Sequence, residues 1–384
     1  MVTKVGLAGT GFIGSGIARL IVNHHSDLEV SSVLTRRLTE ELSLFPSTKG
    51  VTQSIAKFVE SCDLVVECSG DPVHATNVVD AALQAGKPVV TMNSEFHVTT
   101  GSYFVDRGYL TEAEGDQPGC LAALREDMLQ MGFKPLVYGN MKGFLNHNPS
   151  PEDMLYWSRR QGIAPSQTTA FTDGTKMQIE QVLIGNAAGA TIAQQGLIGI
   201  KSDDLNVAAD ELCKVAVGLD SPIVDYTLSS KLAPGVFIAA THDACEVQAL
   251  KYYKLGEGPY FALLRPYHLC AFETIKTIRR AINGGSVLLN NGSEPRLSIA
   301  AIAKRVIKRD EVIDAPTGGF MIRGEAVEVS KANDHVPIGI LKGARLLTNI
   351  EPGQMLTWSD VELIDSLAAR IAKSLFCRIK ILAA

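Results

Sequence analysis

Residues 5–14 constrain the fold of this chain most, because a short apolar strand runs there into a glycine-rich turn. Gly9 allows a tight turn, Gly11 lets the backbone approach a pyrophosphate, and Gly14 lets the next helix pack closely on the strand. The N–H groups at the start of that helix point toward an anion. We therefore predict a dinucleotide site formed by Gly9, Thr10, Gly11, Phe12, Ile13 and Gly14.

The end of the second strand indicates which dinucleotide binds. A helix expected over residues 15–24 leads to a strand over residues 29–34, and Thr35, Arg36 and Arg37 follow it. An NAD enzyme usually has an acidic residue at this position, whereas two guanidinium groups suit a ribose phosphate. The sequence predicts NADP(H), the alternative being a solvated loop that happens to contain two arginines.

Two further buried strands, over residues 62–67 and 88–92, end in small polar residues. Parallel strands deliver such loops to one edge of a doubly wound sheet, where ligands bind. We expect Ser69, Gly70 and Asn93 to contact the cofactor and Glu95 to contact the substrate. An amphipathic helix over residues 73–85 lies between these strands.

Composition limits the class of protein. With 384 residues the chain is long enough for two or three domains, and 46% hydrophobic and 20% charged residues describe a globular protein. A net charge of −5 and an isoelectric point near 5.9 argue against nucleic acid as a partner. Polar residues interrupt the apolar segment 179–200, so no membrane span is expected. Seven cysteines without paired spacing fit reduced thiols and no metal site.

These patterns predict an α/β protein of three parts. Residues 1–138 form an NADP-binding Rossmann domain whose last strand covers residues 136–138, and residues 139–294 form an α/β substrate-binding and dimerisation domain. Residues 295–384 read as a small all-β domain with a terminal helix that starts at a Ser359/Glu362 capping box. We expect a cytoplasmic homo-oligomer, a dimer or tetramer, that acts on a small molecule.

Lys176 is the first candidate for proton transfer. It lies in the first turn of a helix expected over residues 177–190, where the helix dipole and burial would both lower its pKa. Asp173 is expected to cap this helix and could orient the lysine. Glu180, one turn later on the same face, could pair with Lys176 or help to hold a divalent cation, for which the sequence offers no further support.

Two other groups of residues are candidates. Arg265, Tyr267 and His268 follow a strand expected over residues 260–264 and would converge with Tyr260 to bind a phosphate or carboxylate, unless they form a structural loop. Cys120, at a predicted helix start, would be the nucleophile if the chain were a semialdehyde dehydrogenase.

Several segments resemble the homoserine-dehydrogenase-like oxidoreductases that end in a SAF (β-clip) domain, and in particular the deoxyxylulose-phosphate reductoisomerase-like type. The resemblance implies a C-terminal β-clip, and it aligns Lys142 with a family lysine that could meet an anionic group of the substrate. Homoserine is excluded as substrate, because Ser94 and Glu95 stand where homoserine dehydrogenases have a lysine. The segments are residues 9–14, 92–95, 115–118, 173–176, 234–237, 258–261, 265–269 and 336–362.

The sequence thus predicts an NADP(H)-dependent oxidoreductase that acts on the carbonyl or hydroxyl group of a small anionic, phosphorylated sugar or hydroxy-aldehyde, with a reductoisomerase as one form. Two alternatives stay open at this point. One is the cysteine-dependent semialdehyde dehydrogenase using Cys120. The other is a non-catalytic protein that binds NADP(H) as a sensor.

Overall fold

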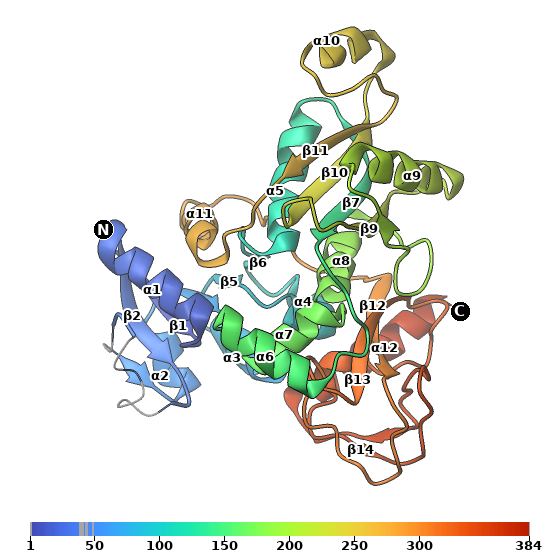
Figure 1. Ribbon diagram of the computed structural model, residues 1–384. Helices are drawn as coiled ribbons and strands as arrows, with labels where there is room; N and C mark the ends of the chain where they lie inside the picture. The colour runs from blue at the N-terminus through green and yellow to red at the C-terminus, as the bar shows by residue number, and fades with distance from the viewer. Residues whose placement is uncertain (1, 38–41, 43–44, 48–49, 384) are drawn as a thin grey trace.

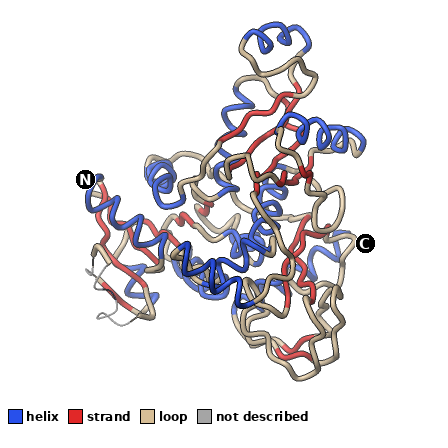
Figure 2. The backbone as a smooth tube through the Cα atoms, viewed as in Figure 1, coloured by secondary structure: helices blue, strands red, loops and turns tan. Residues whose placement is uncertain are grey.

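The computed structural model describes residues 2–37, 42, 45–47 and 50–383 of the chain. A parallel sheet with its helices is followed by a mixed sheet and then by a C-terminal part of short strands (Figure 1). Helices and strands alternate in the first part, whereas loops make up much of the third (Figure 2). The expected α/β class with a Rossmann-like N-terminal domain and a further α/β domain is confirmed.

The N-terminal sheet contains parallel strands in the order β3-β2-β1-β4-β5-β6. The order reverses between β1 and β4, and the carboxyl ends of the strands at such a point form the ligand-binding crevice of doubly wound sheets. The strands are β1 Thr3–Ala8, β2 Leu28–Leu34, β3 Val51–Thr52, β4 Leu64–Glu67, β5 Val89–Thr91 and β6 Leu110–Glu112.

Helices cover both faces of this sheet because buried side chains alternate along its strands. Val5 and Leu7 of β1 pack on the face of α1 and α11, whereas Ala8 packs on the face of α2 and α3. The C-terminal helix α12 also lies against α3. These helices are α1 Phe12–His24, α2 Ile55–Glu60, α3 Pro72–Gln84, α11 Cys270–Ile282 and α12 Leu367–Ala383.

The segment after β5 turns into a helix directly at the end of the strand. The side-chain oxygen of Asn93 accepts a hydrogen bond from the N–H of Phe96, so helix α4 (Ser94–Thr99) begins at once. A short 3₁₀ turn, Gly101–Phe104, follows it. Residues 94 and 95 therefore stand in the first turn of a helix at the ligand edge of the sheet.

The second sheet is mixed, with the order β11-β10-β7-β9-β8. Helices α5 and α8 cover one face and α9 covers the other, while α6 and α7 pack on each other before α8. The strands are β7 Lys134–Lys142, β8 Ile200–Lys201, β9 Ile223–Leu228, β10 Gly235–Thr241 and β11 Phe261–Arg265. The helices are α5 Gln117–Gln130, α6 Pro151–Gln161, α7 Pro165–Thr172, α8 Thr175–Ala188, α9 Leu205–Gly218 and the short α10 Val247–Tyr252.

One strand was placed in the wrong sheet by the sequence analysis. Residues 136–138 do form a strand, but it is part of β7, which pairs with β9 and β10 in the second sheet. The last strand of the N-terminal sheet is β6 instead. Helix α11, although it follows the second sheet in sequence, packs on α1 of the N-terminal domain through Ala271, Ile275 and Ile278.

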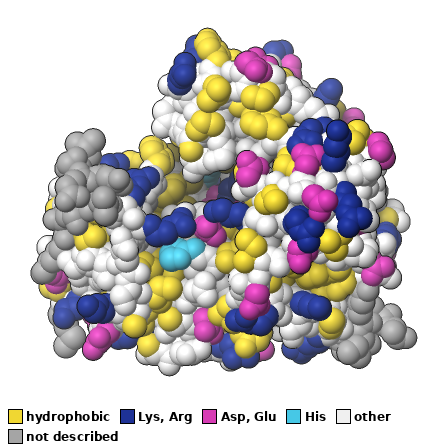
Figure 3. Space-filling view, turned by 90° about the horizontal axis from the view of Figure 1, so that it is seen from below, with side chains coloured by type: hydrophobic (Ala, Val, Ile, Leu, Met, Phe, Trp, Pro, Cys, Tyr) yellow, Lys and Arg dark blue, Asp and Glu magenta, His cyan; other side chains and the backbone are white. Residues whose placement is uncertain are grey.

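The C-terminal part contains two antiparallel strand pairs, β12 (Leu297–Ala303) with β13 (Ile322–Glu328) and β14 (Arg345–Leu346) with β15 (Val361–Glu362). Residues 338–341, expected as a strand, contain a 3₁₀ turn. The capping box predicted at Ser359 and Glu362 is wrong, because Glu362 lies in β15 and α12 begins only at Leu367. Viewed from below, the surface has a hollow beside which basic, acidic and histidine side chains gather (Figure 3).

Candidate active site

The glycine turn after β1 has the geometry of a pyrophosphate cradle. Gly9 has φ +124°, and a Cβ there would lie 2.7 Å from the carbonyl oxygen of Cys68. A Cβ on Gly14 would lie 2.1 Å from the oxygen of Gly9, so α1 can pack this closely only without a side chain. Gly11 differs, because a Cβ there would meet nothing within 4 Å. Its missing side chain leaves open space over the start of α1.

This open space fits a bound dinucleotide. Helix α1 begins with no side-chain cap and no acidic residue in its first turn, so its first N–H groups are left for an outside anion. Phe12 is exposed at the first position of the helix, whereas Ile13 packs on the core of the sheet. The protein itself gives Gly11 no steric reason to lack a side chain, and a pyrophosphate provides one.

The predicted ribose-phosphate residues lie beside this cradle. The hydroxyl oxygens of Thr10 and Thr35 are 3.0 Å apart, and the guanidinium of Arg37 donates to the carbonyl oxygen of Thr10 over 3.2 Å. Arg36 and Arg37 are exposed at the end of β2. The Arg37 guanidinium is therefore held next to the glycine turn.

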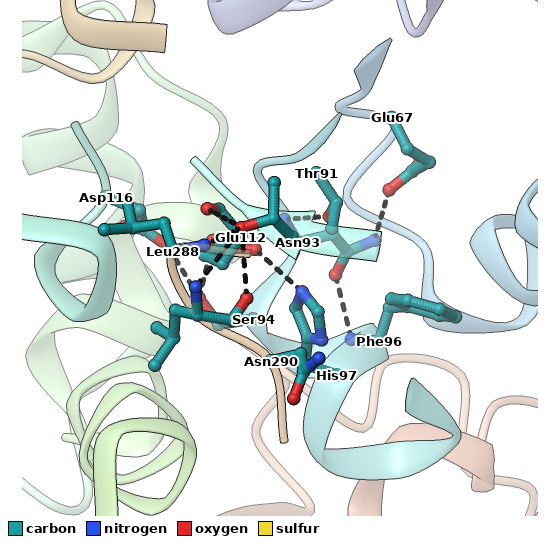
Figure 4. Close-up of polar contacts among 12 residues, drawn as sticks. Glu67, Thr91, Asn93, Ser94, Phe96, His97, Glu112, Asp116, Leu288 and Asn290 are labelled. Atoms are coloured by element: carbon teal, nitrogen blue, oxygen red, sulfur yellow. Dashed lines mark hydrogen bonds and ion pairs between the residues drawn. The ribbon is translucent and has the colours of Figure 1, made fainter. Parts of the chain in front are cut away.

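At the ends of β4 and β5 the structure adds a carboxyl group that the sequence analysis missed. Glu67 is fully buried, and its oxygens accept hydrogen bonds from the N–H of Ser69 over 2.9 Å and from the side-chain amide of Asn93 over 3.1 Å. Figure 4 shows the contact with Asn93. Burial raises the pKa of Glu67 to about 7. The sequence could have indicated Glu67, because it is a charged residue at the end of an otherwise apolar strand. Glu67 links the Ser69–Gly70 turn to Asn93.

Lys176 occupies the centre of a polar cluster formed by several elements. Its Nζ lies 3.0 Å from Asp116 Oδ2, 3.6 Å from Glu180 Oε1 and 3.4 Å from Ser94 Oγ. Ser94 Oγ in turn donates to Asp116 Oδ2 over 2.6 Å. The Lys176 side chain is 24% exposed, and its ammonium group is held by carboxylates. The predicted pairing with Glu180 is confirmed.

The expected lowering of the Lys176 pKa is wrong. Burial alone would lower it, but the charges of Asp116, Glu180 and Glu112 outweigh burial, and the pKa of Lys176 is raised. In the same cluster burial raises the pKa of Asp116, but the charge of Lys176 and hydrogen bonds from Ser94 and Lys176 outweigh it and bring the value to about 2. The pair is therefore an ammonium and a carboxylate near neutral pH.

Behind this pair lies a second carboxyl group and a buried imidazole. Glu112 Oε1 is 3.3 Å from Ser94 Oγ, and Glu112 Oε2 is 3.4 Å from His97 Nε2 (Figure 4). Burial and the charge of Asp116 raise the pKa of Glu112 well above its usual range, while burial lowers the pKa of His97 to about 3. Burial thus disfavours the charged form of both side chains.

Lys142 lies on the other side of Glu180. Its Nζ donates to Gln117 Oε1 over 2.7 Å and is 3.5 Å from Glu180 Oε2, and Asn140 donates to both of these oxygens. Lys142 is the last residue of β7. Lys142 and Lys176 consequently flank one carboxylate.

Asp173 has a different partner from the one suggested. Its carboxylate accepts from the N–H of Thr175 over 2.9 Å, and it binds the ammonium of Lys304, which comes from the C-terminal part of the chain. The N-cap position of α8 is held by Gly174. Lys176 is oriented by Asp116 and Glu180, so Asp173 anchors the start of α8.

The predicted convergence of Arg265, Tyr267 and His268 with Tyr260 is observed only in part. The Arg265 guanidinium lies over the Tyr267 ring, 5.4 Å from its centroid, but Tyr260 does not join them. Arg265 forms ion pairs with Glu114 and Glu273, and Tyr267 is exposed. Tyr260 packs toward α9 on the opposite face of the second sheet. Only His268 retains an influence on the Lys176 cluster, where its charge helps to lower the pKa of Asp116.

Cys120 is unsuited to nucleophilic catalysis. It is fully buried in the first turn of α5, with Sγ 3.6 Å from Glu273 Oε2. Burial and the charge of Glu273 raise the pKa of this thiol, so the thiolate that a semialdehyde dehydrogenase needs is disfavoured. The structure therefore contradicts the alternative that relied on Cys120.

Several residues of the cluster were absent from the sequence-based candidates. Asp116 and Gln117 stood in a segment recognised only as part of a resemblance, and Ser94 was noted only as a replacement for a lysine. Glu112 and Asn140 lie inside strands, where no local pattern marks them. In the described part of the chain, no group of at least three His, Cys, Asp or Glu side chains is arranged to hold a metal ion.

Comparison with known families agrees with this geometry. Residues 9–103 match the family described as homoserine dehydrogenase, NAD binding domain, and residues 115–274 match the family described as oxidoreductase DRL, catalytic domain. The first match contains the glycine cradle and the second contains Asp116 and Lys176. The chain is an NAD(P)-dependent oxidoreductase, which excludes the purely sensing alternative. No curated protein sequence matches the chain.

Solved structures with related folds are distant. A UDP-N-acetylglucosamine 3-dehydrogenase from Acidithiobacillus ferrooxidans is 12% identical over 76% of this chain and 92% of its own, with a TM-score of 0.45. A scyllo-inositol dehydrogenase from Lactobacillus casei with bound NAD(H) and scyllo-inositol has the same identity and coverage, with a TM-score of 0.41. A homoserine dehydrogenase from Thiobacillus denitrificans is 21% identical over 47% of this chain and 43% of its own, with a TM-score of 0.32.

Among the described residues, no helix combines the length and the apolar character that crossing a membrane requires.

Proposed function

We propose that the protein uses NADPH to reduce the carbonyl group of a small hydroxylated substrate carrying a phosphate or another anionic group, with Lys176 as the proton donor. One observation carries the proposal. The ammonium group of the partly exposed Lys176 side chain is held by Asp116 and Glu180 and contacts Ser94, at the carboxyl ends of the strands of the dinucleotide-binding sheet. The nicotinamide, when bound, supplies the hydride.

The charge on Lys176 suits the reducing direction. As negative charge develops on the carbonyl oxygen, the ammonium stabilises it and then gives up a proton. Asp116 and Glu180 hold the lysine side chain in one orientation, and Ser94 adds a third contact. These contacts favour a positioned acid over a mobile surface lysine.

The choice of NADP(H) over NAD(H) rests on Arg36 and Arg37. Both are exposed beside the cradle, and Arg37 is already directed to the glycine turn by its bond to Thr10. Guanidinium groups bind phosphate through paired charge-assisted hydrogen bonds.

Contacts around Glu180 support the substrate class. A carboxylate has about four acceptor positions, so Glu180 and Glu95 can accept hydrogen bonds from substrate hydroxyl groups in addition to their present partners. Lys142 is the cation best suited to an anionic group, because Arg265 is already paired with Glu114 and Glu273. The resemblance to deoxyxylulose-phosphate reductoisomerase-like enzymes supports a narrower form, in which a rearrangement precedes the reduction.

We extend the proposal to the remaining features of the chain. The short strand pairs and isolated bridges of residues 295–384 support a SAF-type β-clip. The edge strand β11 and the exposed Tyr252 and Tyr253 near α10 support a homo-oligomer, a dimer or tetramer. Seven free cysteines support a cytoplasmic location. The partners we propose are small molecules, rather than nucleic acid or membranes.

The test is a Lys176→Met variant assayed with NADPH and a panel of phosphorylated ketoses, including deoxyxylulose phosphate, and hydroxy-aldehydes. We expect kcat to fall roughly 100- to 10,000-fold, as removal of a general acid does. NADPH affinity, measured by fluorescence titration, should stay within about threefold, because Lys176 lies outside the cradle. Lys214→Met, on the exposed face of α9, is the matched control.

Two results would contradict the proposal. Full activity of Lys176→Met would remove the lysine from the reaction. Failure of the wild-type protein to turn over any member of the panel, while it still binds NADPH, would exclude the proposed substrate class.

A further inference from the structure

A loop of the C-terminal part reaches the candidate active site. Thr317, between β12 and β13, donates a hydrogen bond from Oγ1 to Glu95 Oε1 over 2.7 Å. Glu95 is the second residue of α4, directly after Ser94, whose hydroxyl contacts both Asp116 and Lys176. A residue 222 positions away in sequence is thus bonded to the carboxyl group next to the Lys176 cluster.

The loop that carries Thr317 is held in place from two sides. Gly318 has φ +77°, and a Cβ there would lie 1.9 Å from the carbonyl oxygen of Ser166 in α7, so the loop fits against this helix only with glycine. The carbonyl oxygen of Gly319 accepts a hydrogen bond from Lys304 over 2.7 Å, and Lys304 also binds Asp173 at the start of α8. The position of the Thr317 hydroxyl is therefore set by contacts to the helices around Lys176.

The surroundings of Glu95 suit a group that changes protonation near neutral pH. Its side chain is partly accessible, in contrast to the fully buried Glu67 and Glu112. Burial raises the pKa of Glu95 to about 7, while the Thr317 hydrogen bond and the charge of Lys176 on α8 lower it. Asp71, which caps α3, raises it further. These are the charged groups facing Glu95 from the described elements packed around it.

We infer that the C-terminal part contributes Thr317 to the active site as a positioning residue, whose hydroxyl holds the Glu95 carboxyl beside the Lys176 cluster and stabilises its charged form. The inference rests on the function proposed above, in which this fixed carboxyl group faces the substrate.

The experiment follows the Glu95 carboxyl directly, without substrate. Isotope-labelled glutamate carboxyl carbons are titrated by NMR in the full-length protein, and the Glu95 signal is assigned by its absence in Glu95→Gln. We expect a midpoint near 7 in the wild type. Thr317→Val removes a donor that stabilises the carboxylate, so its midpoint should rise by roughly half to one pH unit. Thr317→Ser retains the hydroxyl and should leave the midpoint unchanged.

A second comparison tests whether Glu95 shares a site with Lys176. Lys176→Met removes a positive charge that faces Glu95 and should raise the midpoint as well, whereas Lys214→Met should not. A Glu95 signal that titrates near 4.5, or a midpoint that is the same in Thr317→Val and wild type, would overturn the inference. Because the titration needs no turnover, its failure is distinguishable from failure of the proposed substrate class in the activity panel.

Discussion

Lys176 illustrates how neighbouring charges decide protonation at a single residue. A helix start carries about half a positive charge spread over several N–H groups, which disfavours an ammonium. Asp116 and Glu180 each carry a full negative charge at 3.0 and 3.6 Å from Nζ, and Coulomb attraction at that range is larger. The lysine therefore stays an ammonium near neutral pH, which is the form that the proposed reduction requires.

Arg36 and Arg37 support a prediction at the residue scale. Changing both to alanine should weaken NADPH binding by roughly 10- to 100-fold, because charge-assisted hydrogen bonds to the ribose phosphate are lost. NADH has no such phosphate, so its affinity should change less than about threefold. Calorimetric titration of both nucleotides gives the measurement.

Arg19→Ala, on the exposed face of α1, is the matched control and should bind both nucleotides like the wild type. Equal losses for NADPH and NADH in the double variant would contradict the assignment of these arginines to the phosphate.

At the scale of one element, the turn before α1 separates glycines needed for folding from a glycine needed for the ligand. Gly9 and Gly14 are surrounded by backbone atoms that leave no room for a Cβ, whereas Gly11 has φ −76° and an empty neighbourhood. The first two positions are explained by the packing of α1 on the sheet. The third is explained by the cofactor.

Paired substitutions follow from this difference. Gly11→Ala should leave the free energy of unfolding within about 1 kcal/mol of wild type, since an alanine fits the backbone there. Its methyl group would occupy the cradle, so NADPH affinity should fall at least roughly tenfold. Gly14→Ala should lower the free energy of unfolding by several kcal/mol, because overpacking against the Gly9 oxygen strains the turn.

Urea unfolding and nucleotide titration of the two variants provide the measurements. The expectation is contradicted if Gly11→Ala binds NADPH like the wild type, or if Gly14→Ala is as stable as the wild type.

Local patterns explain why some elements could be predicted from the sequence and others could not. The structure contains the glycine turn, α1 and the Lys176–Glu180 pair. Each of these features depends on residues that are close together in the sequence. The capping box at Ser359 failed because Val361 pairs with Leu346, and this strand pairing overrides the local helix signal. The Asp173–Lys304 pair joins residues 131 apart, for which no local pattern exists.

The same reasoning applies to the candidate site. Lys176 was found because it follows a helix start, but its partners Asp116 and Ser94 lie 60 and 82 residues away. Arg265 was assigned to the substrate because it follows a predicted strand together with Tyr267 and His268. Its pairing with Glu114 and Glu273 depends on the packing of α11 against the N-terminal domain, which the sequence did not indicate.

At the scale of the whole molecule, α8 joins the second sheet to the C-terminal part. One continuous core contains Leu183 and Ile184 of α8, Val224 of the sheet, and Leu297 and Ile299 of β12. Hydrogen bonds strengthen this contact. The Thr175 hydroxyl accepts one from the N–H of Gly324, and the side-chain amide oxygen of Gln178 accepts one from the N–H of Ala326. The C-terminal part and the helix that carries Lys176 should consequently unfold together.

Lys304→Met tests this coupling. The Asp173–Lys304 pair is almost completely buried, with side-chain exposures of 0% and 4%, so the variant leaves an unpaired charge in the interior. We expect the free energy of unfolding, from urea denaturation, to fall by about 3–5 kcal/mol. The double variant Asp173→Asn with Lys304→Met removes both charges and should recover much of the lost stability. Lys308→Met, at an exposed position, should leave the free energy of unfolding almost unchanged. If Lys304→Met cost less than about 1 kcal/mol, the pair would not hold α8 to the C-terminal part. The apolar core alone would then fix the position of Thr317 relative to Glu95.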